Sequence, residues 1–257
     1  MDPRSFILSE TNWKTVKETD YEVAILPWGA TEAHNYHLPY GTDNIQNEFI
    51  TAEAARRAWG RGAKVVVLPN IPYGVNCQQL DIKLTINLNP STQFQILMDI
   101  VSALNGQGIK KLVILNGHGG NDFKQMIREL SGKHPEMFIG QINWYSVDPN
   151  WETYFEDSGD HAGEMETSIM LNIVPDWVLP LSEAGNGKAR RLKLKARQEG
   201  WFWAPREWMK VTSDTGIGDP AKSTEQKGEA YLNKVIAKIS NVIVELAGID
   251  LQDKYTL

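Results

Sequence analysis

Short apolar runs alternate along this chain with longer amphipathic segments. The apolar runs are rich in Val, Ile and Leu, which is typical of strands buried on both faces of a parallel sheet. Because parallel strands are joined by crossover connections, usually helices, the alternation predicts an α/β fold. The predicted strands are residues 23–26, 65–68, 112–115 and 138–142, with a weaker candidate at 84–88.

The amphipathic segments predict helices that cover the sheet. Their apolar residues recur at spacings of three and four, which is the repeat of one helix face. Asp43 and Ser91 are the predicted N-caps of two of them. The predicted helices run from 43 to 59, from 91 to 106, from 121 to 131 and from 224 to 247.

Composition narrows the class of protein. The chain has 257 residues, 42% of them hydrophobic, and no linker rich in Pro, Gly and Ser, so we expect one domain over residues 1–257. A net charge of −6 argues against nucleic acid as a partner, because neutralising phosphates requires a basic face.

No apolar run approaches the ~18 residues that span a bilayer, and the start lacks the features of a signal peptide. With Cys77 as the single cysteine, we expect a soluble, cytoplasmic protein with no internal disulfide.

The segment 27–43 combines imidazoles and carboxylates directly after the first predicted strand. Glu32, His34, His37 and Asp43 fall close together there, among glycines and prolines. Neutral imidazole and ionised carboxylate are the usual ligands of zinc and manganese, so the segment predicts a loop that holds a divalent metal. The alternative is an ordinary polar loop.

A second segment, 113–121, places His118 after another predicted strand. Ligands bind at the carboxyl ends of strands in open α/β sheets, so His118 is a site candidate. Gly119 and Gly120 would let the backbone approach a metal or a substrate closely. The alternative is a histidine whose hydrogen bonds are satisfied within the turn.

A third segment, 160–168, opens an apparent helix with His161, Glu164 and Glu166. Glu166 shares a helix face with Ile169 and Met170, whereas Glu164 points away from that face. A buried carboxylate is costly unless a cation compensates it, which makes Glu166 a candidate metal ligand. A first-turn glutamate favoured by the helix dipole is the alternative, and it suits Glu164 better.

The distribution of histidines supports a common site. The chain has five histidines, and all except His134 fall in these three segments. His134, before a proline, is interpreted as a surface residue that ends a helix.

The segment 175–219 is the least regular part of the sequence. Its basic residues alternate with apolar ones from Leu192 to Arg197, which predicts an edge strand with one charged face. The alternatives are a patch for a substrate anion or a subunit contact. Trp208 is expected in a lid or subunit interface, whereas Trp144 and Trp151 are expected to wall the substrate pocket.

Together these motifs resemble the creatininase (creatinine amidohydrolase) family. The resemblance spans roughly residues 20 to 230, with the motifs in the family's order. It is carried by Glu32-x-His34, His37-Leu38-Pro39, Thr42-Asp43, Asn116-Gly117-His118-Gly119-Gly120-Asn121, His161-Ala162-Gly163, Glu166-Thr167-Ser168, Gly218-Asp219-Pro220 and Glu225-Gln226-Lys227-Gly228.

The resemblance implies a three-layer α/β/α fold with a mostly parallel central sheet and two divalent metals at the strand ends. Glu32, Asp43 and His118 would hold one metal, and His34 the other, with Asp43 bridging. Creatininase itself has a further glutamate ligand where this chain has Gly120, and we expect Glu166 to supply that carboxylate. Imidazole and carboxylate ligands suit zinc, manganese and iron alike.

The resemblance also implies a hydrolase of amide or other C–N bonds in a small, perhaps cyclic, substrate, and a homo-oligomer such as a hexamer. His161 is the expected general acid, with Glu164 as a second catalytic candidate. Further substrate-binding candidates are His37, Gly119, Gly120 and Gln79, which replaces a histidine of the family. A ring-opening hydrolase of a cyclic polyol ketone and a non-catalytic binding protein are the alternatives.

Overall fold

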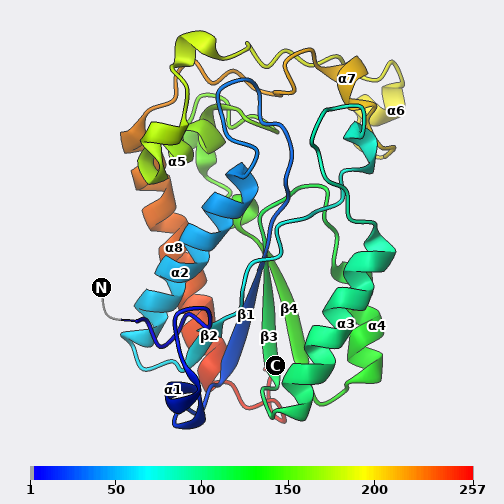
Figure 1. Ribbon diagram of the computed structural model, residues 1–257. Coiled ribbons are helices and arrows are strands. Elements are labelled where there is room, and N and C mark those ends of the chain that lie inside the picture. Colours follow the sequence, from blue (N-terminus) through cyan, green and yellow to red (C-terminus); the bar gives the residue numbers. More distant parts are fainter. Residues whose placement is uncertain (1–2, 257) are drawn as a thin grey trace.

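The computed structural model describes residues 3–256 and contains a parallel four-stranded sheet (Figure 1). Neighbouring strands pair in register, with Ile25 between Val67 and Val113. The predicted α/β class with a parallel central sheet is confirmed. The strands are β1 (Val23–Trp28), β2 (Val65–Val67), β3 (Lys111–Asn116) and β4 (Phe138–Asn143), in the spatial order β2-β1-β3-β4.

Helices cover both faces of this sheet and complete three layers (Figure 1). Side chains alternate between the faces of a strand, so Ile25 and Leu26 of β1 belong to different cores. The core around Ile25 lies under α2, α5 and α8, and the core around Leu26 lies under α3 and α4. The bounds are α2 (Thr42–Trp59), α3 (Pro90–Gly106), α4 (Lys124–Lys133), α5 (Glu164–Ile173) and α8 (Glu225–Gly248).

Shorter elements lie in the connecting loops. None of the helices within residues 3–256 is long and apolar enough to cross a membrane. The short α-helices are α1 (Trp13–Lys17), α6 (Lys195–Gln198) and α7 (Trp208–Val211), and single 3₁₀ turns form at Cys77–Gln79, Trp144–Ser146, Trp151–Thr153, Pro175–Trp177 and Leu181–Glu183.

Two predicted strands are wrong. Residues 84–88 make only isolated bridges, because Leu84 adopts a left-handed conformation with φ of 65° that interrupts an extended run. The alternating run from Leu192 forms no strand either, and α6 begins within it at Lys195. Leu192 and Leu194 remain about half exposed, so the apolar half of the alternation faces no core.

Two helices begin at other N-caps than the predicted ones. Gly41 is the N-cap of α2, and no side chain caps this helix, so Asp43 lies inside its first turn and its carboxylate does not serve as a cap. Asn89 rather than Ser91 is the N-cap of α3. The predicted start of the last helix is confirmed, since the Thr224 side chain accepts a hydrogen bond from the Lys227 amide at 3.3 Å.

Candidate functional site

The loop after β1 delivers the first two side chains of the site. β1 is buried along its whole length, and the loop that follows carries Glu32 and His34 to the carboxyl edge of the sheet. Asn35 is held in a left-handed conformation, φ 55°, by a hydrogen bond from its amide to the Thr215 hydroxyl. This turn aims His34 back toward the first turn of α2, where Asp43 lies. Strained backbone of this kind is common at functional sites.

His118 enters the site from the turn after β3. Its Nε2 lies 3.1 Å from the Val75 carbonyl oxygen, which can only accept, so Nε2 carries the hydrogen. Nδ1 therefore faces the carboxylates, 2.7 Å from Glu32 Oε1 and 3.1 Å from Asp43 Oδ2. An imidazole fixed in one tautomer by a backbone carbonyl is the usual arrangement of a metal ligand.

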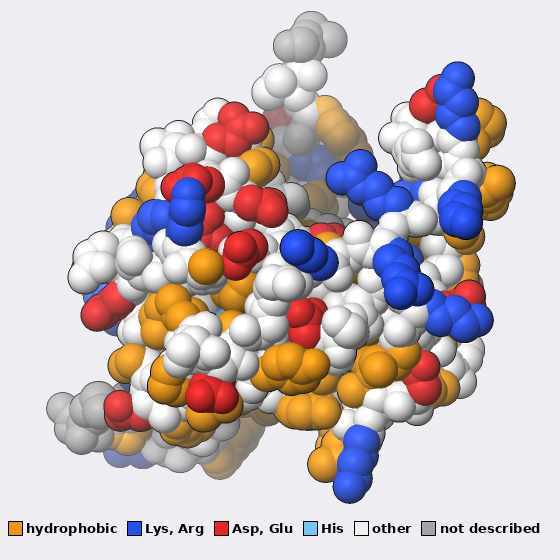
Figure 2. All heavy atoms as spheres, turned by 90° about the horizontal axis from the view of Figure 1, so that it is seen from above, with side chains coloured by type: hydrophobic (Ala, Val, Ile, Leu, Met, Phe, Trp, Pro, Cys, Tyr) orange, Lys and Arg blue, Asp and Glu red, His pale blue; other side chains and the backbone are white. Residues whose placement is uncertain are grey.

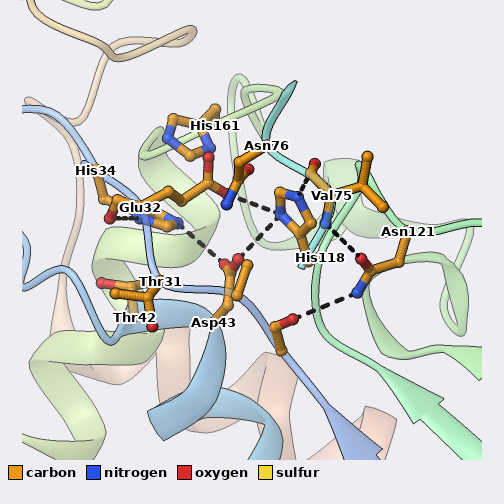
Figure 3. Close-up of polar contacts among 12 residues, drawn as sticks. Thr31, Glu32, His34, Thr42, Asp43, Val75, Asn76, His118, Asn121 and His161 are labelled. Carbon is orange, nitrogen blue, oxygen red and sulfur yellow. Dashed lines mark hydrogen bonds and ion pairs between the residues drawn. The ribbon is translucent and has the colours of Figure 1, made fainter. Parts of the chain in front are cut away.

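His34 lies on the other side of Asp43. Its Nε2 is 3.0 Å from Asp43 Oδ1 and 3.9 Å from Glu166 Oε1, while its Nδ1 contacts the Glu32 carbonyl oxygen at 3.2 Å. The two carboxylate oxygens of Asp43 thus face different imidazoles (Figure 3). Two groups of three possible ligands therefore share Asp43, namely Glu32, Asp43 and His118, and His34, Asp43 and Glu166.

The electrostatics of this cluster favour a bound cation. Glu32, His34 and Asp43 are at most 2% exposed. Apart from the His118 imidazole, Glu32 Oε1 and Asp43 Oδ2 have no hydrogen-bond partner among the described residues. Burial opposes charge on both imidazoles, yet Asp43 raises the pKa of His34 to about 10 and Glu32 raises that of His118 well above its usual value. Buried carboxylates need compensating positive charge, and divalent metals can replace the protons that the imidazoles would otherwise bind.

Gln79 is buried and contacts Glu32. Its Nε2 donates to Glu32 Oε2 and, at 3.0 Å, to Asn76 Oδ1, and the residue is 1% exposed. The predicted contact with substrate is therefore replaced by a contact that orients Glu32. Such contacts to the outer oxygen of a ligand carboxylate fix its direction.

His161 lies over the cluster from the turn before α5. Its Nε2 lies 2.8 Å from the Ala33 carbonyl oxygen and so carries the hydrogen, which leaves Nδ1 without one in the neutral ring. The ring centroid is 4.1 Å from that of His34, and His161 also forms a group of three possible ligands with Glu32 and His34. A left-handed Ala162, φ 52°, sets this turn.

The two glutamates of α5 have opposite surroundings, and the helix-face argument was wrong about their burial. Glu164 is the buried one, and its carboxylate pairs with Lys227 and accepts hydrogen bonds from the amides of Glu156 and Asp157 at 2.9 and 3.2 Å. These contacts engage the Glu164 oxygens away from the cluster, and its expected catalytic role stays a prediction. The Glu166 side chain is 18% exposed and lies beside His34. The partial removal of the Glu166 carboxyl from water raises its pKa.

Three other residues that were predicted to contact substrate have partners within the protein. His37 is 1% exposed, and its Nε2 bonds Thr167 of α5 at 2.9 Å, so it fastens the loop to the helix. Burial and the nearby His34 lower its pKa to about 4, so it is neutral at pH 7. Trp144 is 1% exposed within the core under α2 and α8, and Trp151 packs against the same core. Both tryptophans pack against this core, and their expected contact with substrate stays a prediction.

Trp208, which was expected in a lid or subunit interface, is 3% exposed and meets the His161 ring edge-on at 5.2 Å. The sequence did not predict this contact, because no local signal links two residues so far apart, and it did not predict the role of Asn121. Asn121 bonds the Val75 amide at 3.0 Å and the Asn116 side chain at 3.0 Å, and so fixes the carbonyl that orients His118. The paired asparagines of the turn were visible in the sequence as polar residues at a strand end.

Gly120 and Gly119 offer a matched pair of substitutions. A Cβ on Gly120 would lie 2.3 Å from the Val75 carbonyl oxygen and 2.4 Å from His118 Nε2, whereas a Cβ on Gly119 meets nothing within 4 Å. We expect Gly120→Ala to displace His118, to weaken binding of one metal, and to lower the free energy of unfolding by about 1–3 kcal/mol. Urea unfolding and metal titration of both variants check this, and equal effects of the two substitutions would contradict it.

Comparison with known proteins agrees with this architecture. The family model described as Creatininase, creatinine amidohydrolase, matches residues 9–243. A mycofactocin precursor peptide peptidase of Mycobacterium ulcerans (strain Agy99) is 27% identical over 218 residues, covering 82% of this chain and 80% of that protein. A creatinine amidohydrolase of Pseudomonas putida is 26% identical over 219 residues, covering 68% and 74%.

Solved structures are similar over nearly the whole chain. The crystal structure of a candidate creatinine amidohydrolase from Bacteroides fragilis NCTC 9343 is 44% identical with a TM-score of 0.91, and covers 96% of this chain and 98% of that one. A manganese form of creatininase, 23% identical with a TM-score of 0.78, covers 96% and 100% and shares the fold. Since the family model matches most of its length, the chain belongs to the creatininase (creatinine amidohydrolase) family.

Proposed function

We propose that this protein is a metal-dependent amidohydrolase that binds two divalent ions. The observation that carries the proposal is the buried Asp43 carboxylate, whose two oxygens face two different imidazoles. Glu32 and His118 complete one set of three ligands, and His34 and Glu166 complete the other. Three protein ligands are usual at catalytic zinc sites that keep a position open.

Imidazole and carboxylate ligands without a thiolate fit zinc, manganese or iron. Manganese and zinc forms of creatininase are known, which supports the first two. Bound there, divalent ions would acidify a water molecule and polarise a carbonyl group.

His161 is the residue proposed to move the proton. Its Nδ1 is free to accept a proton because its Nε2 is committed to the Ala33 carbonyl oxygen. The ring lies within reach of Glu32 and His34, where the scissile bond would be placed. A group in this position can pass the proton on to a leaving nitrogen, so its expected role is that of an acid–base catalyst.

Relatives support cleavage of a C–N bond as the reaction class. One similar protein bears the name of a peptide peptidase and another that of creatinine amidohydrolase. Both names describe hydrolysis of an amide. We infer that the substrate of this chain is a small amide, a cyclic amide or a short peptide.

Metal analysis and a substrate panel test the proposal together. We expect roughly two ions per chain and hydrolysis of members of a panel of lactams, formamides and short peptides. Retention of no ion, together with binding of a small ligand, would show a non-catalytic binding protein. Activity confined to cyclic ketones in the same panel would show a ring-opening hydrolase.

Glu166→Gln tests the third ligand of the second metal. We expect this variant to keep the ion bound by Glu32, Asp43 and His118, and to bind the other at least about tenfold more weakly, because an amide is a poorer ligand than a carboxylate. Glu164→Gln is the matched control on the same helix. It should keep both ions but lower the free energy of unfolding by about 1–3 kcal/mol through the weakened Lys227 contact. Metal titration separates the two, and loss of an ion from the Glu164 variant alone would contradict the assignment.

A further inference from the structure

A long segment beside the candidate site carries charge opposite to the rest of the protein. Residues 186–211, called the arm, include α6 and α7 and hold eight Lys or Arg against two Glu, in a chain whose net charge is −6. Figure 2 shows Lys and Arg side chains gathered on one side of this end of the molecule. Such segregation of charge points to a function in binding anions.

The arm borders a cavity of about 960 Å³. Seven of its eight basic side chains line this cavity, while Lys195 does not. Two of the seven are paired, Arg206 with Asp160 and Lys210 with Glu207. Among the described residues, the other five have no carboxylate within ion-pair distance, namely Lys188, Arg190, Arg191, Lys193 and Arg197. Three carboxylates, those of Asp157, Glu207 and Asp219, also line the cavity, so seven basic side chains face three acidic ones and leave an excess of four positive charges. An anion bound there would compensate this excess.

The cavity shares a wall with the candidate metal site. Ile217 lines the cavity and pairs with His161 through two backbone hydrogen bonds of 2.8 and 3.0 Å. Arg206, which also lines it, pairs with Asp160 next to His161, and its guanidinium carbon lies 4.6 Å from the centre of the Trp208 ring. Trp208 in turn meets the His161 ring. A molecule held in the cavity is thus one layer of side chains from His161.

The first residues of the arm are hydrogen-bonded to the segment that follows the arm. The buried Asp214 carboxylate accepts hydrogen bonds from the amides of Gly187 and Gly216, each at 3.0 Å. Gly187 has a φ of 60°, and a Cβ there would lie 1.9 Å from the Gly218 carbonyl oxygen. The Arg190 amide also donates to the Val211 carbonyl oxygen at 2.8 Å, so the two ends of the arm are held together.

We propose that the cavity binds an anionic group of the substrate, a phosphate or a carboxylate, while the metal cluster acts on an amide in the same molecule. This inference rests on the proposed hydrolase function. Arginine suits such a site because its planar fork binds either anion through two parallel hydrogen bonds. The substrate class is then a small amide that carries a phosphate or a carboxylate, and the cavity contributes to its selection.

Calorimetric titration with inorganic phosphate, glutarate and neutral glutaramide tests the proposal on the protein with its metals. We expect phosphate or glutarate to bind and glutaramide not to bind. Arg190→Gln/Arg191→Gln should weaken anion binding at least about tenfold, because it removes two charge-assisted contacts. The matched control Lys14→Gln/Lys195→Gln changes the net charge equally outside the cavity and should leave binding unchanged. An equal loss in both double variants would overturn the proposal.

Two further results separate this site from its neighbours. The Asp43→Ala variant should still bind the anion. If this variant loses anion binding while the arginine variant keeps it, the anion binds to the metals, and the proposal is overturned. If neither anion binds and the arginine variant dissociates from an oligomer, the cavity is a contact with a second copy of the chain, and the proposal is overturned. Anion binding without hydrolysis of any amide would contradict the proposed function alone, and hydrolysis without anion binding would contradict the cavity assignment alone.

Discussion

Asp43→Ala is expected to remove both metals and, with them, all turnover. Asp43 is 2% exposed, and its two oxygens lie 3.0 Å from His34 Nε2 and 3.1 Å from His118 Nδ1. Without this carboxylate each ion keeps only two protein ligands and loses its main compensating charge. Elemental analysis after dialysis should find roughly two ions per native chain and almost none in the variant.

Asp99→Ala is the control for this experiment. Asp99 is an exposed carboxylate on α3, so its removal changes the net charge equally without touching the cluster. The control should keep its metals. Native metal content in the Asp43 variant would contradict the bridging role, because a carboxylate inside a helix but outside a metal site affects only stability.

His161→Ala is expected to keep both metals and to lower kcat by at least about 100-fold, the usual contribution of a proton-transfer group. The expectation follows from the position of His161, whose Nε2 is fixed by the Ala33 carbonyl oxygen and whose ring lies 4.1 Å from that of His34. Metal content and turnover of the same preparation measure the two effects separately.

His134→Ala is the matched histidine control for that variant. His134 is the C-cap of α4 and lies outside the three motifs, so its substitution should change neither metal content nor kcat. Loss of one ion from the His161 variant would identify His161 as a ligand, completing the third possible group with Glu32 and His34. A His161 variant with native kcat would exclude it from the reaction.

The sequence predicted the sheet and the cluster because both follow from local rules. Buried parallel strands leave continuous apolar runs, and the loops after β1 and β3 must open at the same edge of the sheet. Glu32, His34 and His118 could therefore be placed together from residue type and position alone. Asp43 was assigned as a helix cap and as a ligand, and the structure gives the cap to Gly41.

The errors come from packing that no local pattern records. α5 packs against both α2 and α8, so it has no single buried face, and the spacing rule ranked Glu164 and Glu166 wrongly. Gln79 contacts the ligand carboxylate of Glu32, and Trp144 packs into the core under α8; both contacts are with residues distant in the sequence, so no local pattern indicates them. Residues 192–197 of the arm alternate like a strand, yet within residues 3–256 they pair with no strand of the sheet, and α6 begins among them at Lys195.

Anomalous diffraction at the absorption edge of the metal found by elemental analysis would locate the ions relative to Asp43. The proposed bridging role of Asp43 predicts two peaks in crystals of the native protein, one among Glu32, Asp43 and His118 and the other among His34, Asp43 and Glu166, with one oxygen of Asp43 on each. A single peak, or two peaks of which only one contacts Asp43, would contradict it.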